Sequence, residues 1–325
     1  MLVWLDGQFN TRTKPQENFG REVMELFTVG VDFYTESDVY AAARVFSGWN
    51  LRESQGYNRT DMNAYQEFVY NSGEHETSDK TFSFPIYSNG SHTIPARSES
   101  AGMQDGVDLI TALAVHPETA RRLARKFWGF FISEIQQPDP VFVESTAAVY
   151  LQSGTEIRPV VRHILSSPWF NDPSMHFARY AWPAEYVARA IKEVGWQNFS
   201  LDKARTPLAA MGQLLFEPPN VGGWPLGAGW FSTGTMLART NFAATLAASQ
   251  KESLGAEFES AGQTPQALFQ VMLSRVTPAP FDSVPQQALM SYLQSGAGSW
   301  NSAQVTTRAA GLARLLVGSA EYQLV

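Results

Sequence analysis

The sequence predicts a mainly α protein, a multi-helical orthogonal bundle with a small irregular β insertion near residues 60–97. Apolar residues recur at helical spacing through most of the 325 residues, whereas strand-like runs are confined to 65–70 and 81–87. No period of roughly 20 to 50 residues repeats, which argues against a solenoid. We therefore expect a single mainly helical domain over 1–325, with 49–97 as the insertion and 250–325 as a C-terminal helical subdomain.

Composition narrows the class of protein. Hydrophobic residues make up 44% and charged residues only 17%, as in a folded globular chain, and the net charge of -7 argues against a nucleic-acid partner. The absence of cysteine excludes disulfides, thiol catalysis and thiolate metal sites. No apolar run is long enough for a transmembrane helix, and no signal peptide starts the chain. Nucleotide-binding glycine motifs are also missing, so we expect no cofactor.

The most regular helical pattern runs from Pro15 to Gly30, where proline suits a first turn and glycine a helix end. Its apolar residues share one face, and the opposite face carries Glu17, Arg21, Glu22 and Glu25. Two carboxylates one turn apart can hold a proton unequally, so that one donates while the other stays ionised. Glu22 and Glu25 are therefore candidate catalytic residues, with Arg21 tuning them and Glu17 binding substrate. The alternative is a solvated surface helix with an i,i+4 ion pair.

Further helices follow in order along the chain. A capping box at Thr35 and Asp38 begins the second helix, which ends near Gly48. A polar linker is expected over 250–262. The remaining helices are predicted at 103–115, 117–133, 141–152, 156–166, 183–194, 206–215, 235–249, 264–275, 285–294 and 302–317.

The helix over 117–133 has a basic face formed by Arg121, Arg122, Arg125 and Lys126. This face suits either an anionic substrate or the acidic helix across a groove. Arg125 is the member that we expect to face Glu22 or Glu25, as a further catalytic residue. A partly buried network of glutamate and arginine between two helices is the structural alternative. His116, directly before Pro117, is expected to begin this helix.

Four polar residues lie within six positions of the insertion: His75, Glu76, Asp79 and Lys80. A histidine beside carboxylates can act as a general base or bind a metal ion. No HExxH or EF-hand spacing is present, so we predict no metal site. His75 and Asp79 are candidate catalytic residues and Lys80 a substrate-binding residue. The alternative is a loop histidine with a hydrogen-bond partner.

A loop rich in Gly, Pro and Trp, EPPNVGGWPLGAGW, covers 217–230 and precedes another helix. Tryptophan faces together with amide and guanidinium groups suit sugar rings, which present apolar CH patches edged by hydroxyls. The candidate substrate-binding residues here are Asn220, Trp224, Trp230 and Arg239. A tightly packed loop whose tryptophans cover the core is the alternative.

Four stretches resemble, in the same order, the bacterial family catalogued as domain of unknown function 1800. They are ENFGREVMELFTVGVDFYTESDVYAAARVFSGW from Glu17, EHETSDKTF from Glu74, HPETARRLARKFW from His116 and LLFEPPNVGGWPLGAGWFSTGTMLARTNF from Leu214. Members of this family are usually longer at the N-terminus and often exported. The resemblance thus implies a periplasmic or secreted protein, and the apolar start MLVWLDG indicates a chain that begins partway through a longer one. The family pattern usually reads His-Asp where this chain has His75-Glu76.

Clustered carboxylates, low overall charge and the tryptophan loop together predict a hydrolase acting on carbohydrate, a glycosidase with paired carboxylates. Its substrate would be a small molecule or a polysaccharide. One alternative is a non-catalytic binding or assembly protein of the bacterial envelope. Another is a metal-assisted esterase or phosphoesterase built on His75.

Overall fold

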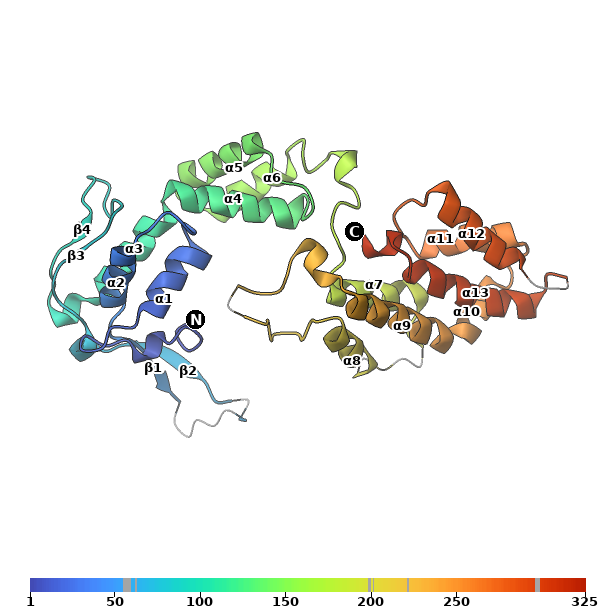
Figure 1. Ribbon diagram of the computed structural model, residues 1–325, viewed down its shortest axis with the longest axis horizontal. Helices are drawn as coiled ribbons and strands as arrows, with labels where there is room; N and C mark the ends of the chain where they lie inside the picture. Colours follow the sequence, from blue (N-terminus) through green and yellow to red (C-terminus); the bar gives the residue numbers. More distant parts are fainter. Residues whose placement is uncertain (55–59, 62, 198–199, 201, 221, 296–298) are drawn as a thin grey trace. The chain divides into compact units, whose positions relative to one another are not determined.

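The computed structural model describes residues 1–325 except 55–59, 62, 198–199, 201, 221 and 296–298. Over these described residues it contains thirteen α-helices and two small antiparallel sheets, which confirms the mainly α fold with a small β insertion. The chain divides into two compact units (Figure 1). The first is Met1–Phe131 with Pro138–Asn171, and the second is Ile132–Gln137 with Asp172–Val325.

The first unit holds the acidic helix, the β insertion and the basic helix. Its elements, in order, are η1 (Gly7–Phe9), α1 (Glu17–Glu22), the π-helix η2 (Val23–Phe27), α2 (Glu36–Val45), β1 (Trp49–Glu53), β2 (Gln66–Tyr70), η3 (Ser72–Glu74), β3 (Lys80–Thr81), β4 (Thr93–Ile94), η4 (Glu99–Ala101), α3 (Met103–Ala114), α4 (Pro117–Phe131), α5 (Pro140–Gln152) and α6 (Ile157–Leu165).

Helix α2 begins with the predicted capping box. The Thr35 hydroxyl accepts from the Asp38 amide at 3.3 Å, and the Asp38 carboxylate accepts from the Thr35 amide at 2.7 Å. After the helix, Gly48 adopts φ +80°, and a Cβ there would collide with the Asn71 carbonyl. This turn leads directly into β1, a strand that the sequence pattern did not indicate.

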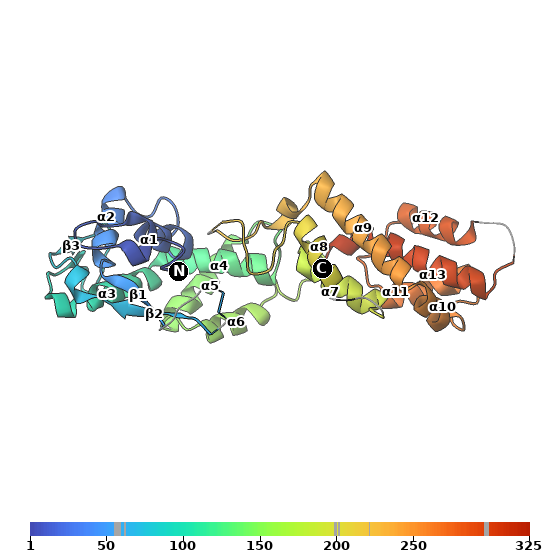
Figure 2. The same ribbon diagram turned by 90° about the horizontal axis from the view of Figure 1, so that it is seen from below.

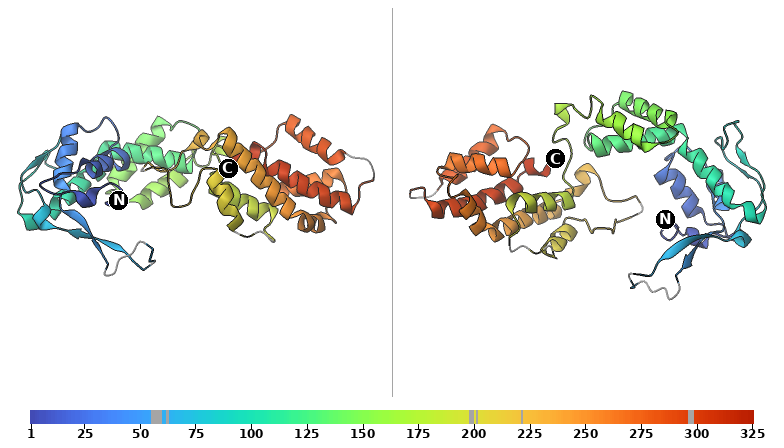
Figure 3. Two further views of the ribbon diagram at one scale, coloured as in Figure 1. Left: turned by 60° about the horizontal axis from the view of Figure 1, so that its bottom comes forward. Right: turned by 180° about the vertical axis from the view of Figure 1, so that it is seen from behind.

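Strands β1 and β2 pair antiparallel, with Leu51 opposite Phe68. The Trp49 ring packs edge-on against Phe46 at 5.1 Å and against Phe68 at 5.2 Å, which ties the ribbon to the end of α2. Figure 3 shows this ribbon extending away from the helices of its own unit. The predicted strand at 65–70 is confirmed as β2, whereas the predicted strand at 81–87 is reduced to Lys80–Thr81 in β3.

The core of the first unit is formed where α1, α2 and α3 meet under the insertion. Met24, Val39, Leu109 and Ile94 are completely buried there. Helices α4, α5 and α6 extend the unit around an aromatic series, in which Trp128 packs edge-on against Phe142, and Phe142 against Trp169.

The regular elements of the second unit are all helices over the residues that the structure describes. Its elements are η5 (Pro173–Met175), α7 (Pro183–Val194), α8 (Asp202–Ala210), η6 (Gly227–Trp230), α9 (Thr233–Ser249), α10 (Lys251–Phe258), α11 (Pro265–Arg275), α12 (Ser283–Gln294), α13 (Ser302–Val317) and η7 (Glu321–Gln323).

Residues 251–258 form helix α10 where the sequence predicts a polar linker. Leu254 and Phe258 are buried, and α10 packs along α13, as Figure 2 shows. Gly255 permits this close packing, because a Cβ at that position would overlap Thr306. The linker prediction was wrong because the apolar residues of such a short helix are too few to outweigh its polar composition. Helices α9, α10 and α13 share one core, so the predicted boundary at residue 250 differs from the observed division.

Within the described residues, none of the helices combines the length and apolar character that crossing a membrane requires.

Candidate functional site

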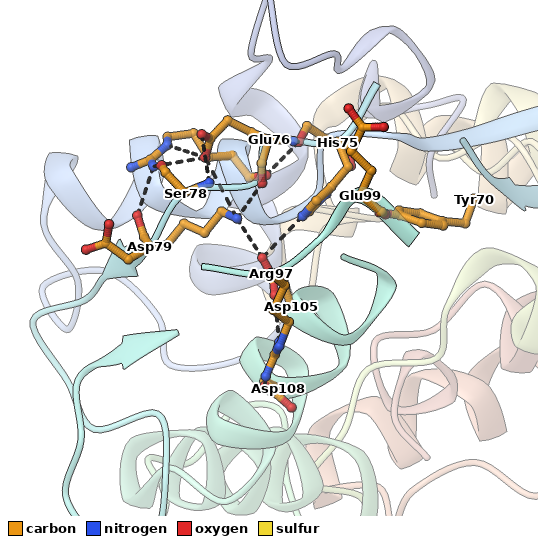
Figure 4. A network of polar contacts seen from close by, with 12 residues as sticks. Tyr70, His75, Glu76, Ser78, Asp79, Arg97, Glu99, Asp105 and Asp108 are labelled. Carbon is orange, nitrogen blue, oxygen red and sulfur yellow. Dashed lines mark hydrogen bonds and ion pairs between the residues drawn. The ribbon is translucent and has the colours of Figure 1, made fainter. Parts of the chain in front are cut away.

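A buried ion network surrounds Asp105 on helix α3 (Figure 4). The carboxylate accepts from Lys80 Nζ at 2.6 Å and from Arg97 Nη1 at 2.6 Å, and His75 Nε2 lies 3.2 Å from it. Asp105, Lys80 and His75 are fully buried. We call this cluster, together with Glu76, Arg44 and Asp108, the Asp105 network.

The His75 ring is held by polar partners on both of its nitrogens. Nδ1 lies 2.9 Å from the Ser47 carbonyl oxygen, which can only accept a hydrogen bond. Nε2 faces the Asp105 carboxylate, which is also an acceptor when it is ionised. Both ring nitrogens thus have a polar partner, and the ring bridges the end of α2 to helix α3. Gly102 leaves room for the ring, because a Cβ there would overlap it and the Tyr70 hydroxyl.

In the outer part of the network, the carboxylates are also paired with cations. Glu76 pairs with Arg44 at 2.9 Å, and its backbone carbonyl accepts from Lys80 Nζ at 2.5 Å. Asp108 accepts from Arg97 Nη2 and from the Tyr87 hydroxyl, both at 2.6 Å. Each carboxylate in the network thus has a cation beside it.

Burial and hydrogen bonding oppose each other at these carboxylates. Burial disfavours ionisation of Asp105, but the hydrogen bonds from His75 and Lys80 outweigh it and hold its pKa below the usual range. At Asp108, bonds from Tyr87 and Gln104 likewise overcome burial and lower the pKa. The carboxylates of the network are therefore ionised. The centre of the network is closed to solvent, and its polar groups bind one another. These bonds join the insertion to α2 and α3.

Sequence analysis placed His75, Asp79 and Lys80 in one polar cluster. The structure brings His75 and Lys80 together, but around Asp105, which sequence reasoning did not single out. The Asp79 side chain is exposed, and it is its backbone carbonyl that accepts from Arg44 at 2.9 Å. A usable signal for Asp105 was its position between Gly102 and Gly106, two glycines in one helical region that allow side chains to approach closely.

The described residues contain no group of three or more His, Asp or Glu side chains placed to hold a metal ion. Within the Asp105 network, Lys80 and Arg97 already occupy the carboxylate oxygens that a cation would need.

A second polar cluster lies on α1 and η2 and has a different character. Glu22 and Glu25 are half-buried, and the Tyr34 hydroxyl donates to Glu25 at 2.5 Å. Burial and the neighbouring charge of Glu25 raise the pKa of Glu22, against the smaller opposing effect of Arg21. Burial and the bond to Glu25 raise the pKa of Tyr34 to about 12, so the phenol remains a donor. We call these three residues the Glu22–Glu25 face.

Arg21 is held mainly by Glu36, and it also interacts with Tyr34. Its guanidinium forms two hydrogen bonds with Glu36, at 2.6 and 2.7 Å, and reaches Glu17 only at 3.5 Å. The bonds to Glu36 raise the pKa of Arg21 and lower that of Glu36. Glu22 consequently has no ion-pair partner among the described residues.

The basic face of α4 approaches the end of η2, although not through the predicted residue. Arg122 Nη2 and Lys126 Nζ donate to the Leu26 carbonyl at 3.2 and 3.3 Å. Cations at carbonyls that have no partner within the helix are a favourable way to end it. The expectation that Arg125 faces Glu22 or Glu25 is not met: its side chain is exposed and contacts neither carboxylate. Arg125 lies one position before Lys126, so its side chain points about 100° away from that of Lys126 around α4.

The tryptophan loop belongs to the second unit. Trp230 is 2% exposed and packs against Trp182, and Arg239 is fully buried between the Tyr186 and Phe231 rings. Burial lowers the pKa of Arg239 to about 10. Neither of these predicted substrate-binding side chains presents a surface to solvent.

The other two predicted residues of the loop are more accessible. Trp224 is half-buried, and Asn220 is exposed, with its side-chain oxygen accepting from the Gly222 amide at 2.8 Å. Glu134 anchors the rest of the loop by accepting from Trp182 Nε1 and the Gly227 amide, at 2.8 and 3.0 Å.

Fold and site together define a mainly helical protein with a sealed ion network and a separate pair of half-buried glutamates. The chain matches, over residues 1–324, the family described as "Protein of unknown function (DUF1800)", and it belongs to that family. No curated protein and no solved structure matches it.

Proposed function

We propose that the protein is a hydrolase acting on carbohydrate, with Glu22 as the proton donor and Glu25 as its anionic partner. The observation that carries the proposal is the inequality of two adjacent carboxyl groups. The pKa of Glu22 is raised, whereas Glu25 accepts a short hydrogen bond of 2.5 Å from the Tyr34 hydroxyl. One protonated and one ionised carboxyl group is the combination that glycoside hydrolysis uses.

In this mechanism Glu22 gives its proton to the glycosidic oxygen as the bond between that oxygen and the anomeric carbon breaks. Glu25 takes a proton from the water molecule that attacks the anomeric carbon. Each carboxyl group thus changes its protonation once, and solvent restores both afterwards. Tyr34 orients Glu25 throughout, because its raised pKa keeps the hydroxyl protonated.

Two further features support this position on the chain. Glu25 lies in the π-helix Val23–Phe27, and π-helical turns occur frequently at functional sites. Arg21 is engaged by Glu36, so it does little to stabilise the ionised form of Glu22. Glu22 therefore keeps its proton more readily.

The test is a screen of chromogenic glycosides and esters with the parent protein, followed by Glu22→Gln and Glu25→Gln. We expect each substitution to reduce kcat on a cleaved glycoside by about a hundredfold or more. Glu252→Gln is the matched control, because Glu252 is exposed and is not among the candidate site residues. Full activity of the Glu22→Gln protein on a substrate that the parent cleaves would exclude the proposal.

A non-catalytic binding or assembly protein of the bacterial envelope is the second candidate, favoured by the internally satisfied Asp105 network. In that case Glu22→Gln and Glu25→Gln would change no turnover. A metal-assisted esterase built on His75 has less support, since both ring nitrogens already have partners. An exported location remains part of the proposal, as the family resemblance implies.

A further inference from the structure

An open groove lies along helix α6 and the turn that follows it, within the first unit. It has a volume of about 550 Å³, and its lining includes Arg158, Arg162, His163 and Trp169. None of the candidate residues discussed above lines it. The groove is therefore separate from both the Asp105 network and the Glu22–Glu25 face.

The two arginines are placed where they do not stabilise the helix. Arg158 lies in the first turn of α6, at the positive end of the helix dipole, where a cation is unfavourable. Arg162 follows four residues later, so the two like charges are neighbours on one face. Both side chains are exposed, and neither has an ion-pair partner in the part of the chain that the structure describes. An anion in the groove would offset both unfavourable contributions.

The wall beside the arginines is rigid and apolar. The Trp169 ring is held edge-on against Phe142 at 5.5 Å, and its Nε1 donates to Asp139 at 3.3 Å. Asp139 is at the same time the N-cap of α5, accepting from the Val141 amide at 2.7 Å. Its carboxylate is thus engaged in fixing the ring.

We propose that this groove binds a sugar ring that carries a carboxylate or sulfate group. Arg158 and Arg162 would hold the oxyanion through charge-assisted hydrogen bonds, for which the planar guanidinium is suited. The indole of Trp169, with Pro159 and Pro168 beside it, would contact the apolar face of the ring. A nucleotide also combines an oxyanion with a ring, but no glycine-rich phosphate loop accompanies the groove.

The proposal does not depend on hydrolysis at Glu22, because binding can be measured at equilibrium. Calorimetric titration would compare four probes: a galacturonate oligosaccharide, a sulfated oligosaccharide, a neutral oligosaccharide of equal length and inorganic phosphate. We expect at least one acidic oligosaccharide to bind, with affinity that falls as salt is added. The neutral oligosaccharide and phosphate should bind at least tenfold more weakly.

The double variant Arg158→Gln/Arg162→Gln should weaken binding of the acidic oligosaccharide by about tenfold or more, because it removes two charge-assisted contacts. Arg205→Gln/Arg314→Gln is the matched control: both residues are exposed, and the net charge changes equally. Equal weakening by the control pair would overturn the proposal, as would tighter binding of inorganic phosphate than of either acidic oligosaccharide. Glu22→Gln should leave this binding unchanged, which separates it from the proposed hydrolysis.

Discussion

The Asp105 network and the Glu22–Glu25 face are both charged regions of the first unit, but their carboxylates differ in whether cations are bound to them. Asp105 is fully buried, and cations on Lys80 and Arg97 hold its carboxylate. Glu22 is half-buried and lies beside another carboxylate, while the nearby arginine is engaged elsewhere. The pKa is therefore lowered at Asp105 and raised at Glu22.

This difference separates a structural role from a chemical one. A buried charge with all its partners in place stabilises the arrangement around it, and removing one partner leaves the others uncompensated. A carboxyl group whose charged form is disfavoured contributes little to stability, but it keeps its proton to a higher pH than an ordinary glutamate and can act as an acid. The two regions should consequently respond to neutralisation with opposite signs.

The largest effect is expected for Asp105→Asn. The substitution leaves the fully buried Lys80 with only a distant carboxylate, Glu76 at 3.8 Å, and removes one of the two carboxylates that hold Arg97. The free energy of unfolding should therefore fall by about 3–5 kcal/mol. Urea unfolding at pH 7 measures the change. Asp79→Asn is the control, because this exposed carboxylate forms no ion pair among the described residues and should change stability by less than about 0.5 kcal/mol. Similar losses of unfolding free energy in Asp105→Asn and Asp79→Asn would contradict the structural role of the Asp105 network.

The same variant sharpens the comparison at acid pH. Because folding lowers the pKa of Asp105, its stabilisation is fully present above the unfolded value, near 4, and is lost as pH falls through the lower folded pKa. Asp105→Asn should therefore show a shallower loss of stability below about pH 4 than the parent.

A smaller change of opposite sign is expected for Glu22→Gln. It removes the repulsion between Glu22 and Glu25, so unfolding at pH 7 should require about 0.2–0.5 kcal/mol more. Because folding raises the pKa of Glu22, the parent carries this penalty above the folded pKa and loses it as pH falls below the unfolded value. The gain should thus disappear near pH 4. Loss of stability at pH 7, measured against Glu17→Gln, would place Glu22 with the structural charges instead.

A further prediction concerns the pH dependence of His116, a titrating group outside both regions. Its Nδ1 accepts from the Glu118 amide at 3.1 Å at the start of α4, and burial lowers its pKa. Stability should therefore fall as pH drops below about 6.5, where the unfolded histidine takes up a proton first. His116→Asn keeps a capping side chain without this titration. Its unfolding free energy should vary less between pH 7 and 5 than that of the parent, measured by thermal unfolding.

His116→Ala is the comparison for this prediction. It removes both the titration and the cap, so at every pH it should be less stable than the asparagine variant by about 1 kcal/mol. Unchanged pH dependence in both variants would assign the acid sensitivity of the protein to other groups.

Local patterns in the sequence predicted much of the fold. The capping box at Thr35, the position of His116 before α4 and the strand Gln66–Tyr70 are each determined by neighbouring residues, and each is present. Helix α10 and strand β1 were missed, because Gly255 and Trp49 are explained by contacts with distant residues. The candidate site followed the same rule: the pairing of Glu22 with Glu25 was readable at helical spacing, but the engagement of Arg21 by Glu36 was not.

The sequence by itself determined the mainly helical class, the family and the presence of two polar clusters, because periodicity and motif order are local properties. Only the tertiary structure decided which cluster is sealed. His75 and Lys80 lie 30 and 25 residues from Asp105 along the chain, and no local pattern indicates that the three meet. Burial depends on packing between such distant segments. The degree of burial and the partners that come with it decide whether a cluster of charged residues has a structural role or can donate a proton.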